Sequence, residues 1–195
     1  MMYQVCYDSR MVLFTGKGDD GTTKLFDSPS GVRVLKSAPI FECLGQLDEL
    51  NTLVGWCKVI ATDLQMLGRT GSDVLAEVQN HLFTIQAEVA GAGKFVAHED
   101  VLALSSMITM IEGELPEIKT FLVPGGTEFA ARCDMARAVS RRAERRLVAL
   151  HESGERAISE SSRAYANRLS SLFYALGRFA NAHARVPEHQ PVYDT

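Results

Sequence analysis

The chain has 195 residues, of which 46% are hydrophobic and 23% charged, and its formal net charge is −4. These values are ordinary for one soluble globular domain, and the negative charge argues against a general role on nucleic acid or membrane surfaces. No uncharged apolar stretch approaches the roughly 20 residues that cross a bilayer, and the first residues lack the order of a secretory signal. We therefore expect one domain over 1–195, cytoplasmic, without nucleic-acid or membrane partners.

A turn-rich segment opens the chain, expected to be irregular over 1–37, and it contains the stretch TGKGDDGTTK at 15–24. Glycines there let backbone N–H groups approach phosphate oxygens, Lys17 adds positive charge, and either Thr22 or Thr23 adds a hydroxyl. An ordinary turn is the alternative interpretation, since Lys17 precedes a glycine and not the Ser or Thr of a P-loop. The stretch is thus a candidate phosphate-binding loop.

Metal candidates in the sequence are few. Two acidic residues of the same stretch, Asp19 and Asp20, are candidates for Mg²⁺ held through water, the mode that magnesium on triphosphates prefers. The cysteines, by contrast, lack the close pairing of zinc ligands. They are Cys6, Cys43, Cys57 and Cys133. We expect them to be reduced thiols.

Hydrophobic residues recur every three or four positions after residue 37, the period of an amphipathic helix. The pattern predicts five helices, which we place from Pro39, from a cap at Ser72 to about Gly91, from about Asp100 to Glu114, from Thr127 to Glu152, and over 157–184. The short links favour an all-α fold, a five-helix up-and-down bundle over 38–184. The tail over 185–195 is expected to be loose.

The fourth predicted helix carries a seam of small and apolar residues suited to close packing. The seam comprises Cys133, Ala136, Ser140, Ala143, Leu147 and Leu150. A charged stripe lies beside it, formed by Asp134, Arg137, Arg141 and Glu144. One interpretation is a solvated basic face with internal ion pairs. The sharper one is an anion site, since guanidinium groups bind phosphate or carboxylate bidentately.

Signatures of other chemistry are missing from the sequence. It contains no Glu-x-x-His motif of the kind that builds di-iron bundles. The histidines have no companion set that marks a base for a nucleophile, and we interpret His81 as a half-buried structural residue. Any reaction is therefore expected to depend on electrostatics and positioning more than on proton transfer.

Four segments in the same order resemble one family, the ATP:cob(I)alamin adenosyltransferases of the propanediol-utilisation type. They are TGKGDDGTTKLF (15–26), LGQLDELNTLVG (44–55), FLVPGGTEFAARCDMARAVSRRAERR (121–146) and YANRLSSLFYALGRFAN (165–181). The resemblance runs from about residue 13 to 183. It implies a five-helix homotrimer that moves the 5′-deoxyadenosyl group of ATP to cob(I)alamin, with sites between subunits.

The resemblance also assigns residues by position. ATP contacts fall on Thr15, Gly16, Lys17, Gly18, Thr23, Lys24, Lys36, Arg141, Arg142, Ala143, Glu144, Arg145 and Asn167. Lys17 and Arg141 are the implied catalytic residues. Phe121 matches the aromatic residue that abuts the corrin ring, and Asp48 and Arg137 match a pair that bridges two subunits. Mg²⁺ accompanies ATP, cobalamin is a substrate, and a reductase and an adenosylcobalamin-dependent enzyme are implied partners.

The chain departs from the family pattern at three places. Gly16 and Lys17 stand where a basic residue and then threonine are usual, Asp134 where histidine is common, and Ser171 where aspartate is usual. The last departure bears on catalytic efficiency more than on the fold. Two rival functions remain open: a non-catalytic cobalamin or nucleotide carrier on the same scaffold, and a structural bundle whose arginines only tie subunits together.

Overall fold

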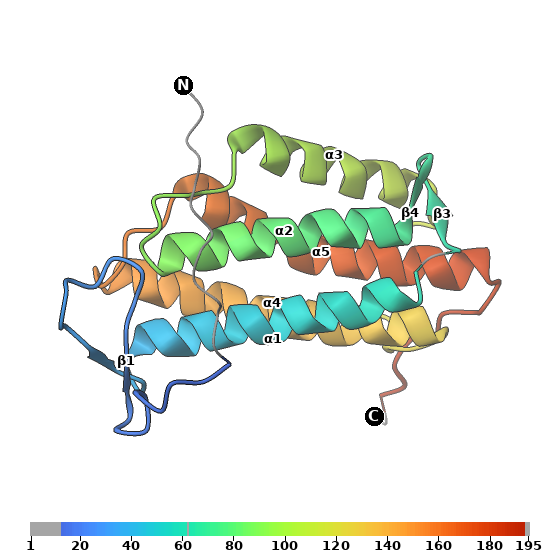
Figure 1. Cartoon of the computed structure of the whole chain (residues 1–195). Coiled ribbons are helices and arrows are strands. Elements are labelled where there is room, and N and C mark those ends of the chain that lie inside the picture. The colour runs from blue at the N-terminus through green and yellow to red at the C-terminus, as the bar shows by residue number, and fades with distance from the viewer. Residues whose placement is uncertain (1–12, 62, 194–195) are drawn as a thin grey trace.

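The computed structural model describes residues 13–61 and 63–193. Within them the chain forms five helices and two short antiparallel ribbons (Figure 1). The helices are α1 (Pro39–Val59), α2 (Gly71–Val89), α3 (His98–Gly113), α4 (Glu128–Glu152) and α5 (Glu160–His183). The ribbons pair β1 (Thr22–Thr23) with β2 (Val34–Leu35), and β3 (Gln65–Met66) with β4 (Arg69–Thr70). The predicted five-helix fold is confirmed.

The order of helices in space differs from their order in the chain. α1 packs against both α2 and α4, α4 packs most extensively against α5, and α3 lies on the outside of the bundle against α5 (Figure 1). Sequential neighbours therefore account for the α1–α2 and α4–α5 pairs, whereas α3 crosses to a helix far along the chain. No helix in the described ranges is long and apolar enough to cross a membrane.

The predicted seam of α4 is buried along its whole length. Gly177 of α5 faces it, and a Cβ at that position would lie 3.4 Å from the backbone oxygen of Ala130 and from Cβ of Cys133. Small residues on both helices thus allow α4 and α5 to approach closely. Cys43, Cys57 and Cys133 are buried and free, as expected, and burial raises the pKa of the Cys43 thiol to about 12. Cys6 lies outside the described residues.

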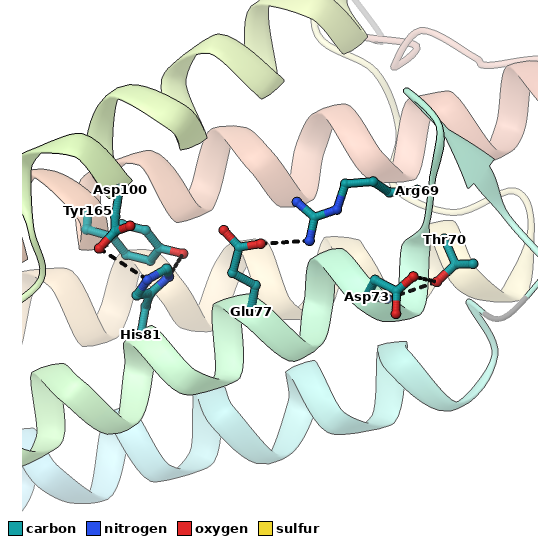
Figure 2. Close-up of polar contacts among 7 residues, drawn as sticks. All are labelled: Arg69, Thr70, Asp73, Glu77, His81, Asp100 and Tyr165. Carbon is teal, nitrogen blue, oxygen red and sulfur yellow. Dashed lines mark hydrogen bonds and ion pairs between the residues drawn. The ribbon is translucent and has the colours of Figure 1, made fainter.

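Helix α2 begins two residues earlier than predicted. The cap is Thr70, whose Oγ1 accepts a hydrogen bond of 3.0 Å from the backbone N–H of Asp73 (Figure 2); the predicted cap at Ser72 is wrong. The β3–β4 ribbon delivers the chain directly to Gly71, so that Thr70 and Asp73 take the spacing of a capping box. Thr127 caps α4 as predicted, accepting from the N–H of Ala130 at 3.1 Å.

A polar cluster joins α2, α3 and α5 (Figure 2). Nδ1 of His81 lies 2.8 Å from the Tyr165 hydroxyl, and its Nε2 lies 3.4 Å from the Asp100 carboxylate. Burial, together with the nearby carboxylates of Glu77 and Asp100, raises the pKa of Tyr165 well above its ordinary value. The phenol thus stays protonated, and His81 joins Tyr165 through Nδ1 and Asp100 through Nε2. His81 is a structural residue, as its pattern indicated.

The tail makes contacts that the sequence did not predict. The backbone oxygen of His189 accepts a hydrogen bond of 2.8 Å from the N–H of Val123, and Glu188 pairs with the buried Arg178 at 3.0 Å. The expectation of a loose tail is therefore wrong for these residues, because a buried guanidinium on α5 supplies a partner for the tail.

Candidate functional site

A cavity of about 720 Å³ lies between the segment that follows α3 and the outer faces of α4 and α5. It is lined by Ile118, Lys119, Thr120, Phe121, Leu122, Arg137, Arg141, Ser170, Ser171 and Tyr174. Three predicted site residues from two distant segments, Phe121, Arg137 and Arg141, thus meet around one space. Phe121 is 79% exposed, so that its ring offers apolar area that a ligand would cover.

The segment from Pro116 to Gly126, which follows α3, forms one wall of this cavity. It is held at its start by Arg178, a charged residue on the buried face of α5. Its side chain is 7% exposed. Nε lies 3.0 Å from the Glu188 carboxylate, and a terminal nitrogen donates to the backbone oxygen of Pro116 at 3.0 Å. One guanidinium therefore fastens both the wall segment and the tail to the bundle.

The wall is pinned at its far end by the loop before α4. The Asn181 amide accepts from the N–H of Thr127 and donates to the backbone oxygen of Gly125, each at 2.9 Å. The N–H of Gly125 donates to Asp134 at 2.8 Å. Gly126 has φ of +105°, and a Cβ there would overlap the Asn181 amide. Only glycine fits this position, which lets the Asn181 amide lie directly against the loop backbone.

Arg137 presents its guanidinium to the cavity without a close partner for Nε. Nε lies 3.7 Å from the Asp134 carboxylate, and the guanidinium lies 5.9 Å from the Tyr174 ring centre. Among the described residues Nε is buried and makes no hydrogen bond. The side chain as a whole is 32% exposed, so the rest of the guanidinium keeps donor capacity for a group outside its own chain.

A second hollow of about 480 Å³ adjoins the first, and Arg141 lines both. Its other lining residues are Glu144, Arg145, Val148, Ala149, Glu152 and Asn167. Nδ2 of Asn167 donates to Glu144 at 2.6 Å. The predicted nucleotide residues of α4 and α5 thus converge on one hollow beside an apolar cavity, and the charged side chains of that hollow are two arginines and two glutamates.

Two residues of the predicted nucleotide run lie elsewhere. Ala143 is 1% exposed in the seam of α4, so the prediction that it contacts ATP is wrong: a run of five consecutive helical residues includes one that faces the core. Arg142 reaches α1, where it donates to Gln46 and pairs with Glu49 at 2.6 Å. It links two helices in this chain.

The loop at 15–24 is ordered by its own hydrogen bonds. Gly16 and Gly21 have φ of +68° and +79°, which favours glycine. Oδ1 of Asp20 accepts from the backbone N–H and from the hydroxyl of Thr22 at 2.9 and 2.7 Å. These bonds hold the pKa of Asp20 below its usual value, and the carboxylate is therefore charged at neutral pH.

Two basic residues of the β2 region fasten the same loop. Arg33 donates to the Thr22 hydroxyl and to the backbone oxygens of Thr22 and Lys17, at 2.6 to 2.8 Å. Nζ of Lys36 donates to the backbone oxygen of Gly18 at 2.7 Å. The predicted nucleotide lysine is thus in place beside the loop, with two of its three ammonium protons left.

The loop and the hollow lined by Arg141 and Arg145 are separate within one chain. Across the described ranges, no hydrogen bond or ion pair joins residues 15–24 to Arg141, Arg145 or Asn167. The loop region is tied instead to the link between α4 and α5, through an Asp27–Arg156 ion pair of 2.6 Å. The described residues also contain no cluster of three or more metal-binding side chains.

Comparison with known proteins decides the family. The profile described as "Cobalamin adenosyltransferase" matches residues 13–180. The chain belongs to the cobalamin adenosyltransferase family. A corrinoid adenosyltransferase of Bacillus subtilis is 35% identical over 187 residues, which are 90% of each chain. The family resemblance predicted from four sequence segments is confirmed.

Other members of the cobalamin adenosyltransferase family are longer. The corrinoid adenosyltransferases PduO of Citrobacter freundii and Salmonella typhimurium are 37% and 35% identical over 175 and 181 residues. These matches cover 86% and 89% of this chain but 49% and 51% of the relatives. The chain therefore spans about half the length of these curated relatives.

Solved structures of the family share the fold. A phenylalanine-to-alanine variant of the PduO-type ATP:corrinoid adenosyltransferase from Lactobacillus reuteri, complexed with cobalamin and ATP, matches with a TM-score of 0.82 at 29% identity. The match covers 92% of this chain and 99% of that one. An arginine-to-lysine variant from the same organism, complexed with ATP, gives 0.80 at 30% identity, over 92% and 100%.

Proposed function

We propose that this chain transfers the 5′-deoxyadenosyl group of ATP to cob(I)alamin, giving adenosylcobalamin and triphosphate. The observation that carries the proposal is the pair of adjoining hollows: an apolar cavity with the exposed Phe121, and a hollow that offers the guanidinium groups of Arg141 and Arg145 and shares Arg141 with the cavity. One suits a large flat ligand and the other an anion, and the reaction needs both ligands side by side.

The reaction requires little or no proton transfer by the protein. Cobalt of cob(I)alamin attacks C5′ of ATP, a cobalt–carbon bond forms, the C5′–oxygen bond breaks, and its electron pair leaves with triphosphate. The protein must hold two large molecules in line and stabilise charge that grows on the leaving group. Arg141, at the junction of the hollows, and Lys17, on the loop, are the residues to which we assign that role.

Phe121 has a separate role in the proposal. Cob(II)alamin is easier to reduce to cob(I)alamin once its lower ligand is displaced. An exposed aromatic ring on the cavity wall would lie against the corrin and exclude that ligand. Because the wall is pinned at both ends, the ring has a fixed place from which to do so.

Magnesium fits the loop through its acidic residues. Asp20 is charged and Asp19 is exposed, and carboxylates with water are the ligands that Mg²⁺ prefers. Bound with ATP, Mg²⁺ would supply positive charge to the triphosphate. The loop residues proposed to approach the triphosphate are Thr15, Gly16, Lys17, Gly18, Thr23, Lys24 and Lys36.

A homotrimer would bring the two halves of the site together. Asp48 is exposed on α1, where it lines a shallow hollow between α1 and α2, and Arg137 has donor capacity to spare. We propose that these two residues pair across a subunit boundary. The loop of one subunit would then lie over the hollow of Arg141 and Arg145 in its neighbour. This arrangement would account for the separation of loop and hollow within one chain.

One assay tests the proposed reaction. The protein is incubated with MgATP, cobalamin and a strong reductant, and the absorption spectrum is followed from cob(I)alamin to adenosylcobalamin. Turnover with release of one triphosphate per product is the expected result. Tight ATP binding without turnover would instead favour a non-catalytic carrier. A reductase and an adenosylcobalamin-dependent enzyme are the partners that the reaction would require before and after it.

A further inference from the structure

We infer that Arg33 is the positioning residue of the nucleotide loop. It acts through the loop backbone, without touching the reacting atoms, and the inference deepens the function proposed above and rests on it. Arg33 lies outside the loop, directly before β2, and was not among the residues that the sequence assigned to ATP.

The Arg33 side chain reaches acceptors at both ends of the loop. Nε of Arg33 donates to the Thr22 hydroxyl at 2.6 Å, and one terminal nitrogen donates to the backbone oxygens of Lys17 and Thr22 at 2.7 and 2.8 Å. The acceptors lie 11 and 16 positions from Arg33 in the chain. Arg33 thus ties the start of the loop to its end.

The acceptors held by Arg33 set the orientation of two other groups in the loop. With the carbonyl of Lys17 held, the peptide that carries the N–H of Gly18 has a fixed orientation. The Thr22 hydroxyl, held by Arg33, donates in turn to Asp20 at 2.7 Å. One guanidinium therefore orients a backbone donor beside Lys17 and, through Thr22, the carboxylate that is the magnesium candidate.

Restraint of the loop by Arg33 lowers the free-energy cost of ordering it when ATP binds. A loop with three glycines in six positions (Gly16, Gly18 and Gly21) has many conformations when it is unrestrained. Ordering it on ATP binding would cost affinity, and holding it beforehand avoids part of that cost. Arg33 and Lys36 lie on the same short segment, but the Lys36 side chain makes one bond to the loop where the Arg33 side chain makes three.

The test compares Arg33→Ala with wild type in steady-state kinetics. We expect KM for ATP to rise about tenfold, as for loss of one charged hydrogen-bonding group, while kcat at saturating ATP and KM for cob(I)alamin stay within about twofold. Arg33→Lys should recover only part of the affinity, since an ammonium cannot reproduce the planar fork. Arg69→Ala, which removes a partly buried arginine paired with Glu77 of α2, outside the nucleotide loop (Figure 2), is the matched control.

A binding measurement separates this inference from the reaction. Calorimetry with inorganic triphosphate needs no turnover, and Arg33→Ala should weaken triphosphate binding by a factor similar to its effect on ATP. Wild-type triphosphate affinity in Arg33→Ala would overturn the inference, as would equal losses for ATP and cobalamin. Failure of the wild-type protein to make adenosylcobalamin would instead overturn the proposed function.

A double-mutant cycle tests the route through Thr22. Thr22→Val removes the hydroxyl that joins Arg33 to Asp20 and keeps the side-chain shape. If Arg33 acts through this hydroxyl, the double variant should lose less triphosphate affinity than the product of the two single effects. Strictly multiplicative effects would overturn the route.

Discussion

Replacing Arg178 by Met should release the segment after α3 from α5, and with it one wall of the apolar cavity. The hollow of Arg141 and Arg145 should stay intact. The substitution keeps an apolar stem in the bundle but removes the bonds to Glu188 and to the backbone oxygen of Pro116. Each charge-assisted bond contributes about 1.5–3 kcal/mol. Since Glu188 is 22% exposed and regains water, we take the low end of each range, about 3 kcal/mol together.

That loss should appear as local opening, because both partners belong to peripheral segments. About 3 kcal/mol corresponds to roughly a hundredfold in an equilibrium constant, which is the upper limit for the weakening of cobalamin binding by Arg178→Met. Cob(II)alamin titration followed by absorbance measures it, with ATP affinity as the internal reference, expected within about threefold of wild type. Glu188→Gln, which keeps an acceptor of the same shape, should cost under tenfold. Parallel losses of cobalamin and ATP affinity, or unchanged cobalamin affinity, would refute the reasoning.

The remaining predictions concern the proposed site directly. Lys17→Ala should weaken ATP binding by about ten- to a hundredfold in calorimetry, and wild-type affinity would leave the loop an ordinary turn. Arg141→Ala should lower kcat more than ATP affinity, because charge on the leaving triphosphate grows in the transition state; a pure KM effect would contradict this role. Phe121→Ala should raise the five-coordinate fraction of bound cob(II)alamin in its spectrum with ATP affinity unchanged, whereas equal fractions would make Phe121 a wall residue only. Arg137→Ala should weaken the trimer in sedimentation, by about 3 kcal/mol or more if Asp48 is left unpaired and buried, and an equally stable trimer would refute the bridge.

Periodicity made the helices predictable, because each buries one stripe. The seam of α4 follows from steps of three and four, and Thr127 is recognisable as the cap that precedes it. The start of α2 was less predictable, since Thr70 and Ser72 both suit a cap and only the ribbon before them decides. The packing of α3 on α5 had no local signal, because any apolar face would accept it.

The site was predictable where a family pattern exists and not where contacts are distant. Phe121 and Arg141 were assigned by resemblance, and both line the same cavity. The role of Arg178 depends on partners at Pro116 and Glu188, which only the fold brings together. One signal was present: a charge within the apolar face of α5 needs a buried partner. Arg33 carried no such signal, since its bonds go mainly to backbone.

The two halves of the proposed nucleotide site belong to parts of the chain with different cooperativity. The arginines lie on α4, which packs along α5 and α1 and so should exchange its amide hydrogens only when the whole bundle unfolds. The bonds that order loop 15–24 join residues of its own neighbourhood, up to Lys36. On heating, the loop should therefore open first. ATP affinity is expected to decline at temperatures where the circular dichroism of the helices is still unchanged.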